Sequence, residues 1–108
     1  MTPRTRRLRY TRAARADLVE IAVFIVRSGG SRSTARRFAA ELDETCRRLA
    51  ASAFATMGRA RPELRPDMRS ATHKNYVIFF RYLAEAVEIV NVLEGHRDLD
   101  GYYERYPS

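Results

Sequence analysis

The side chains in this sequence that are able to do chemistry are mostly guanidiniums. The chain of 108 residues has a net charge of +7, and Lys74 is the single lysine beside nineteen arginines. Arginine presents a planar fork of donors that suits carboxylates and phosphates. Residues 1–83 hold eighteen basic and seven acidic side chains, whereas residues 84–108 hold two basic and six acidic ones. Unless this charge serves only solubility, it predicts an anionic partner, either a nucleic acid or an acidic protein segment.

Few other side chains suggest a catalytic or metal site. The sequence has two histidines, His73 and His96, and one cysteine, Cys46. Cys46 falls on the apolar stripe of an expected helix, which favours core packing over reactivity. His96 follows the last expected strand and is more typical of a turn. A single cysteine excludes an internal disulfide and fits a reducing cytoplasm. We therefore expect no catalytic residue, no metal and no cofactor in a cytoplasmic protein.

The elements that must position the arginines are two helices and a sheet. Residues 6–11 alternate charged and apolar side chains and predict a short strand. Thr11 then caps a helix over 13–27, whose apolar positions recur at helical spacing. The sequence SGGS ends this helix, and Ser31 or Ser33 caps a second one that runs to about residue 53. A short link between two amphipathic helices predicts an antiparallel helical hairpin.

The second half of the chain predicts strands. Residues 76–82 and 86–93 are rich in aromatic and β-branched side chains, and a turn joins them as a hairpin. Residues 58–70 are interpreted as a loop, whose end at 68–72 is a candidate strand. Within the last strand, Val87, Ile89, Asn91 and Leu93 are expected on one face. The result is one α+β domain over 1–108, ordered β-α-α-β-β-β, with the hairpin on one face of a mainly antiparallel sheet. No apolar run reaches the roughly 18 residues that cross a bilayer.

Arg81 interrupts the apolar run VIFF and has two open interpretations. Tyr76, Ile78, Phe80 and Tyr82 alternate with it, so Arg81 faces away from the helices if those four face them. A cross-strand carboxylate, Glu88 or Glu94, would then neutralise it. In the second interpretation Arg81 converges with Arg69 and Arg97 on an exposed sheet face, where the three bind carboxylates or phosphates of a partner.

Four segments resemble one known family. They are YTRAARADLVEIAVFIV near the start, then RPELRPDMRS, NYVIFFRY and VEIVNVLEGHRDL, in the order and spacing of the ParE toxins of the ParE/RelE superfamily. The resemblance covers about residues 7–103. It implies the toxin of a type II toxin–antitoxin module, which acts by binding and inhibiting DNA gyrase. The implied partner is a ParD-like antitoxin in a heteromeric complex, with no membrane and no sequence-specific nucleic acid.

Candidate binding residues follow from the resemblance and from the helix pattern. Val23 and Phe24 lie off the main stripe of the first helix, so we expect them in an apolar groove over the helical hairpin that binds the antitoxin. The resemblance implicates the C-terminal region in toxicity, which makes Tyr102, Tyr103 and Arg105 candidates. These tyrosines also suit packing of the tail against the sheet. Association should be salt-sensitive, because acidic groups of the antitoxin would meet the arginines.

Two rival functions remain open. A RelE-type ribonuclease, which cuts messenger RNA on the ribosome, needs an acid, a base and cationic support. Arginine is a poor general base because it stays protonated. The groups available for such a site are Arg61, Arg65, Arg69, Lys74, Arg81 and Arg97, with Tyr102 or Tyr103, whereas the sequence does not place His73. The other rival is a nucleic-acid-binding module that uses Arg6, Arg7 and Arg9, without a helix-turn-helix signal to support it.

Overall fold

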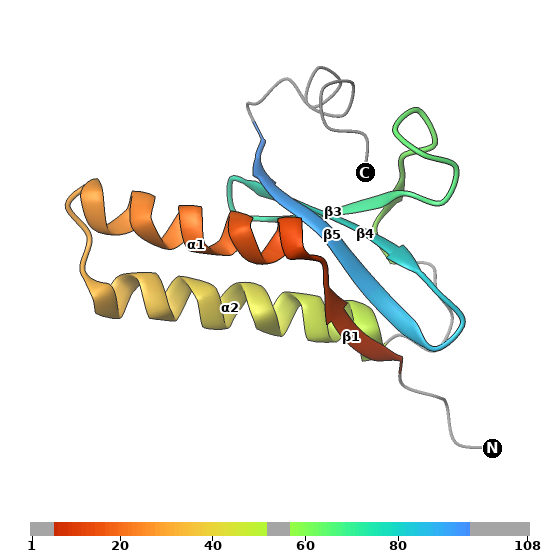
Figure 1. The fold of residues 1–108 in the computed structure, drawn as a ribbon, viewed down its shortest axis with the longest axis horizontal. Coiled ribbons are helices and arrows are strands. Elements are labelled where there is room, and N and C mark those ends of the chain that lie inside the picture. The colour runs from red at the N-terminus through yellow and green to blue at the C-terminus, as the bar shows by residue number, and fades with distance from the viewer. Residues whose placement is uncertain (1–5, 52–56, 96–108) are drawn as a thin grey trace.

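A helical hairpin packs on one face of a five-stranded sheet in the computed structural model, which describes residues 6–51 and 57–95 (Figure 1). The elements are β1 (Arg7–Tyr10), α1 (Arg12–Arg27), α2 (Arg32–Ala51), β2 (Arg59–Ala60), β3 (Arg69–His73), β4 (Tyr76–Tyr82) and β5 (Ala86–Glu94). The sheet order is β1-β5-β4-β3-β2. Only β1 and β5 are parallel, and the other pairs are antiparallel. This architecture confirms the α+β class and the two-helix hairpin expected from the sequence.

Both helix starts are capped as the sequence predicts. The Thr11 side chain accepts a hydrogen bond of 3.0 Å from the backbone N–H of Ala14, and the Ser31 hydroxyl accepts one from Thr34. Such caps satisfy donors that the first turn of a helix leaves unpaired. Between the helices, Gly29 has φ +94°, a left-handed conformation that costs glycine little and that lets α1 end at Arg27 with Ser28 as its C-cap.

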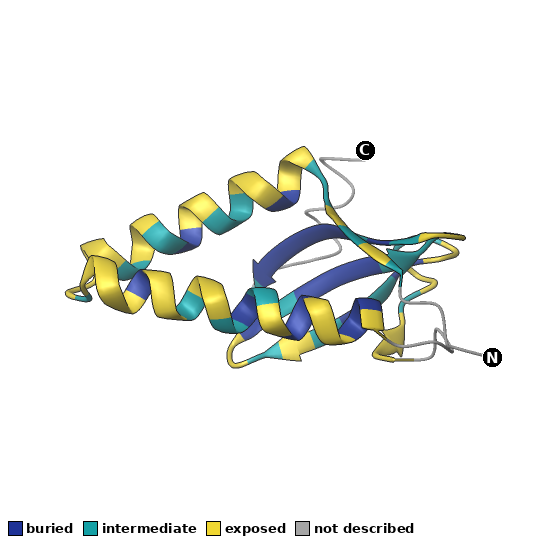
Figure 2. Ribbon diagram, turned by 90° about the horizontal axis from the view of Figure 1, so that it is seen from below, coloured by how far each residue is buried: buried dark blue, intermediate teal, exposed yellow. Residues whose placement is uncertain are grey.

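The main core lies between the helices and the sheet. Tyr76, Ile78 and Phe80 of β4 pack there, as the alternation predicted, together with Leu42, Cys46 and Leu49 of α2 and others from α1 and β5. Figure 2 shows that the outward sides of both helices are exposed while the central strands are buried. A second, smaller cluster covers the opposite face of the sheet, where Leu64 and Met68 pack on Phe79, Val90 and Leu93. Both faces of the central strands are therefore covered, which explains their nearly continuous apolar sequence.

The expected alternation of β5 is wrong beyond Ile89. A β-bulge interrupts the β4–β5 ladder, where Phe80 pairs with Ile89 but Phe79 pairs with Asn91. The extra residue shifts the phase by one, so Val92 joins Val87 and Ile89 in the main core, and Val90 and Leu93 join the second cluster. A strict period of two cannot reveal such an insertion.

The prediction of a loop over 58–70 is also partly wrong. Arg59 and Ala60 form the two-residue strand β2, which pairs with Ser70 and Arg69 of β3. Two residues are too few to show a period. Gly58 precedes this strand at φ +75°, where an added Cβ would lie 2.6 Å from the carbonyl oxygen of Ser70.

Within the residues that the structure describes, no helix combines the length and the apolar character needed to span a membrane.

Candidate partner-binding surface

Helix α1 exposes more apolar surface than a helix packed on a sheet needs to. Val19, Val23, Phe24 and Val26 have exposed fractions of 64%, 42%, 58% and 42%. Among the described residues, the only other large apolar side chain classed as exposed is Met57. Clustered apolar side chains on a soluble surface mark a contact site for another molecule. Val23 and Phe24, which the sequence predicts in an apolar antitoxin-binding groove, both lie on this exposed apolar face.

Val23 lines a hollow between the two helices, which we call the basic hollow. Its volume is about 370 Å³, and its lining is Ala22, Val23, Val26, Arg27, Arg32, Ala35 and Arg36. The floor is aliphatic, and the three arginines are exposed. No carboxylate lies within ion-pair distance of these arginines in residues 6–51 and 57–95. An aliphatic floor with a cationic rim suits an amphipathic segment whose polar side chains are acidic.

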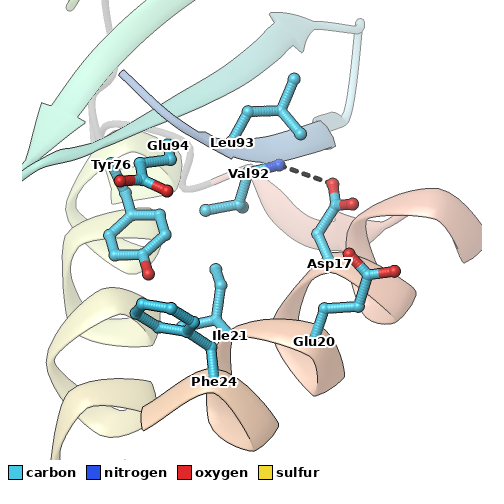
Figure 3. Close-up of a pocket in the computed structure, with 8 residues that line it drawn as sticks. All are labelled: Asp17, Glu20, Ile21, Phe24, Tyr76, Val92, Leu93 and Glu94. Carbon is cyan, nitrogen blue, oxygen red and sulfur yellow. Dashed lines mark hydrogen bonds between the residues drawn. The ribbon is translucent and has the colours of Figure 1, made fainter. Parts of the chain in front are cut away.

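Phe24 lines a different hollow, on the other side of α1, which we call the acidic hollow (Figure 3). It lies between α1 and the end of β5, has a volume of about 90 Å³, and is lined by Asp17, Glu20, Ile21, Phe24, Tyr76, Val92, Leu93 and Glu94. Asp17 accepts hydrogen bonds from the backbone N–H of Val92 at 2.9 Å and from the side chain of Asn91 at 3.0 Å. Sequence reasoning placed Val23 and Phe24 in one groove, but they belong to two.

Arg81 is held by carboxylates of its own chain. Its guanidinium lies 3.2 Å from Glu88 and 3.4 Å from Asp67, and Glu88 also binds Arg9 at 2.6 Å. The contact between Arg81 Nε and Glu88 is an ionic one without hydrogen-bond alignment. The cross-strand partner expected in the first interpretation is therefore present, since Arg81 pairs directly with Glu88 in the β4–β5 ladder.

The expected convergence of Arg69 with Arg81 is wrong. Arg69 pairs with Phe80 in the ladder, so it lies on the helix-facing side of the sheet, whereas Arg81 lies on the opposite side. The Arg69 guanidinium donates hydrogen bonds to the carbonyl oxygens of Met57 and Gly58, at 2.9 and 3.1 Å. These bonds tie β3 to the start of β2.

The remaining candidates, Arg97, Tyr102, Tyr103 and Arg105, lie outside the described residues.

Comparison with known proteins defines the family of the chain. The family model described as the ParE toxin of the type II toxin–antitoxin system, parDE, matches residues 8–99. The chain belongs to the ParE toxin family. A similar solved structure, described as the chromosomal ParDE toxin–antitoxin system from P. aeruginosa, has a TM-score of 0.72 and 25% sequence identity. The match covers 83% of this chain and 96% of that chain. No curated protein sequence gives a significant match.

Among the described residues of this ParE toxin, the cationic groups considered for a ribonuclease site do not gather in one place. Arg61 binds Glu63 at 2.7 Å and stacks over the Phe79 ring, whereas Lys74 binds Glu41 of α2 at 2.9 Å. His73 lies beside Lys74, and its Nδ1 is 3.1 Å from the Thr45 hydroxyl. These groups therefore serve separate packing contacts. Among the residues described, no cluster of His, Cys, Asp and Glu has the geometry to hold a metal ion.

Cys46 is a core residue of this ParE toxin. Its side chain is fully buried, and burial raises the pKa of the thiol to about 11. The nearby hydroxyl of Tyr10 donates a 2.7 Å hydrogen bond to Asp43, and burial together with this bond raises the tyrosine pKa far above its usual range. A thiol that stays protonated is a poor nucleophile, so Cys46 contributes packing.

The residues that sequence reasoning missed are Arg27, Arg32 and Arg36 on the rim of the basic hollow, and Asp17 and Glu20 in the acidic one. One signal was present in the sequence. Arg32 and Arg36 are one turn apart on α2, where they flank Ala35. Small residues beside regularly spaced arginines indicate a shallow floor with a charged edge. Because nineteen arginines are spread along the chain, this signal did not stand out.

Proposed function

We propose that this ParE toxin acts by binding and inhibiting DNA gyrase, without catalysing a reaction, and that a ParD-like antitoxin neutralises it by docking on the basic hollow. The match of the ParE family model to residues 8–99 carries this proposal. A toxin–antitoxin family implies a protein partner, and the exposed apolar face of α1 is a surface that such a partner would cover. We place the toxin in the cytoplasm, where both gyrase and a reduced Cys46 would be found.

The shape and charge of the basic hollow support the antitoxin assignment. Ala22 and Ala35 give a shallow floor where α1 and α2 face each other, and Val23 and Val26 extend it along α1. A helix of the antitoxin could lay its apolar side chains on this floor and direct carboxylates to the arginine rim. Rim charges of this kind mainly accelerate association, whereas the aliphatic contacts set how slowly the complex dissociates.

The arrangement of the arginines favours a binding toxin over a ribonuclease. In-line attack by a 2′-hydroxyl needs an acid, a base and cations around a single phosphate. Arg69 and Arg81 lie on opposite faces of the sheet, and Lys74 is bound to Glu41 at the far end of the β3–β4 hairpin. Because these three cations point to separate regions, they cannot surround one phosphate group.

A supercoiling assay with purified gyrase tests the target. We expect the purified toxin to inhibit supercoiling of a relaxed plasmid, and we expect addition of the antitoxin to restore it. The matched control is heat-denatured toxin at the same concentration, which separates specific inhibition from binding of a basic protein to DNA. If gyrase is unaffected while induced cells show messenger RNA cut at codon spacing by primer extension, the toxin is a ribonuclease of the RelE type and the gyrase proposal is wrong.

A further inference from the structure

Helix α1 separates two hollows whose rims carry opposite charge. Helix positions advance by about 100° per residue, so Asp17, Glu20, Ile21 and Phe24 share one flank of α1, whereas Val19, Ala22, Val23 and Val26 share another. The first flank lines the acidic hollow and the second includes the floor of the basic hollow. The two hollows therefore flank one helix, each with its own set of side chains.

The charge difference is complete among the described lining residues. The basic hollow includes three arginines and no carboxylate, whereas the acidic hollow includes three carboxylates and no basic side chain. Figure 3 shows Asp17 and Glu20 together on one edge of the acidic hollow and Glu94 on another. A partner segment with one kind of charge along its whole length would be attracted to one hollow and repelled by the other.

The outer surface of α1 joins the hollows with an apolar bridge. Val23 and Phe24 are neighbours in the sequence, both are exposed, and each belongs to a different hollow. Val19, the most exposed large apolar residue described, lies one turn before Val23. We call the two hollows with this bridge the α1 saddle. A single polypeptide segment that crosses the saddle could contact Val23 and Phe24 in turn, and it would pass the exposed side chains of Glu20 and Arg27, which lie between them around the helix.

The part of β5 beside the acidic hollow is poorly suited to pair with an added strand. The strand β1 pairs with β5 only as far as Ile89, which leaves the following part of that edge without a strand neighbour in the described residues. However, Thr11 already donates to the carbonyl of Val90 at 2.7 Å, and Asp17 accepts the N–H of Val92. These contacts replace ladder hydrogen bonds that an added strand would need.

The small volume of the acidic hollow further defines its ligand. About 90 Å³ beside Ile21, Phe24, Tyr76 and Val92 is room for one long aliphatic chain, not for a helix. A lysine or arginine side chain fits this description, because its methylenes pack on apolar groups while its charged end reaches the carboxylates.

Building on the proposed function, we propose that one antitoxin segment straddles α1 with a reversal of charge along its length. Its acidic, amphipathic part occupies the basic hollow, and a lysine or arginine beyond the crossing point enters the acidic hollow. The order of these charges would select the cognate antitoxin and exclude related ones, because an antitoxin with uniform charge would place like charges together in one of the two hollows.

Photocrosslinking of the co-expressed toxin–antitoxin complex tests the path of the segment. A photoreactive phenylalanine analogue, p-benzoylphenylalanine, replaces Val26 in one variant and Phe24 in the other, both at exposed positions. Mass spectrometry of the crosslinked peptides should place Val26 beside an Asp- or Glu-rich stretch of the antitoxin and Phe24 beside a different stretch with Lys or Arg. Crosslinks from both positions to the same antitoxin residues would overturn the proposal, and so would a toxin–toxin crosslink from Phe24.

Charge reversal provides a second, independent measurement. Glu20→Lys and Arg36→Glu should each weaken antitoxin binding on the order of fivefold, the range of single exposed ion pairs. The matched controls are Glu44→Lys and Arg59→Glu, exposed residues that line neither hollow, and these should bind like the original toxin. Replacing the crosslinked antitoxin Lys or Arg by Glu should restore binding to the Glu20→Lys toxin.

The outcomes separate this inference from the proposed function. If Arg36→Glu weakens the complex while Glu20→Lys leaves it unchanged or tightens it, the antitoxin docks on the basic hollow alone and the saddle proposal is wrong. If the toxin and the antitoxin form no complex at all, the antitoxin assignment itself fails, and the saddle proposal fails with it.

Discussion

At the scale of single residues, the arginine inside the apolar strand β4 is explained by charges of its own chain. Arg81 and Arg9 both contact Glu88, which is only 16% exposed. From the sequence, Arg81 could either pair with a carboxylate of its own chain or bind a partner. Glu88 and Asp67 are 7 and 14 positions away from Arg81, so sequence separation alone does not show that they contact it. Only the register of the β4–β5 hairpin decides which side chains face each other, and a bulge one residue away makes that register hard to predict.

Removal of Glu88 should reveal how much this cluster contributes to stability. Glu88→Ala leaves two guanidiniums side by side without their shared carboxylate, and it should lower the free energy of unfolding by about 1–3 kcal/mol. Urea denaturation followed by circular dichroism measures the change. Glu63→Ala is the matched control, because Glu63 is 52% exposed and its pair with Arg61 should contribute little. Equal effects of the two substitutions would mean that the Glu88 cluster contributes no more to the free energy of unfolding than an exposed ion pair does.

Residue types alone predict that Val23 and Phe24 are exposed, because both are large, apolar and off the main stripe of the helix, and both side chains are exposed. That they lie in separate hollows depends on how α1 sits between α2 and β5, which one sequence does not state. The role of Arg69 in binding the carbonyls of Met57 and Gly58 was equally hidden, since backbone acceptors leave no mark in side-chain patterns.

At the scale of elements, the junction between β1 and α1 performs two tasks with one side chain. The Thr11 hydroxyl accepts from Ala14 at the start of the helix and donates to Val90 at the bulge of β5. It therefore couples a helix cap to the irregular part of the sheet. Capping was predictable from the sequence TRAARADL, but the second bond was not, because it reaches a residue 79 positions away.

Thr11→Ala should destabilise the fold by about 1–2 kcal/mol, the cost of losing a cap together with a partly buried hydrogen bond. Thr11→Ser keeps the hydroxyl and should recover most of the loss. Thermal unfolding of the two variants next to the unaltered toxin measures both effects. A serine variant as unstable as the alanine variant would show that the methyl group of Thr11, not its hydroxyl, is what the junction needs.

An ion pair connects the turn between β3 and β4 to α2. Lys74 adopts φ +55°, uncommon for a residue with a side chain, and its ammonium binds Glu41 at 2.9 Å. The hydrogen bond from Lys74 is the main reason that the pKa of Glu41 is lowered from its usual value of 4.5. A carboxyl whose pKa is lower in the folded state stabilises the fold above pH about 4.5, and that contribution is lost as the pH falls through the folded pKa.

Lys74→Met should therefore change how stability responds to acid. The variant should be less stable than the original toxin at pH 7. The difference should shrink as the pH falls below about 4.5 and through the lowered pKa of Glu41, because below that pKa Glu41 is protonated in both proteins. Urea unfolding at several pH values measures it. The difference should stay constant with pH if Lys74 acts only through its backbone conformation.

At the scale of the whole molecule, the division of charge is between surfaces, not simply between the two ends of the chain. Sequence counting found a basic body and an acidic tail, yet Asp17 and Glu20 come from the basic part and still build an acidic hollow next to Glu94. Several arginines that raise the net charge are neutralised by neighbours, whereas those around the basic hollow are exposed. The fold class, by contrast, followed directly from the order and periodicity of the segments.

Salt should slow the encounter with the antitoxin. The association rate measured by stopped-flow should fall as ionic strength rises from about 0.05 to 0.5 M. A shorter screening length weakens the long-range attraction between the arginine rim of the basic hollow and the acidic side chains of the antitoxin. The dissociation rate should change much less. A toxin with Arg27, Arg32 and Arg36 all replaced by Gln should associate more slowly at low salt and show a weaker dependence. An association rate that does not vary with salt would rule out electrostatic steering.

The strand order has a consequence for the biosynthesis of the toxin. Of the elements that the structure describes, β1 is synthesised first and β5 last, yet the two are neighbours in the sheet, and Val87 and Ile89 of β5 contribute to the main core (Figure 1). A nascent chain that still lacks β5 cannot close its sheet, however well its helices have formed. A ribosome that stalls before β5 has emerged would hold an incompletely folded chain that lacks the acidic hollow. Proteases should degrade such a chain before it can act as a toxin.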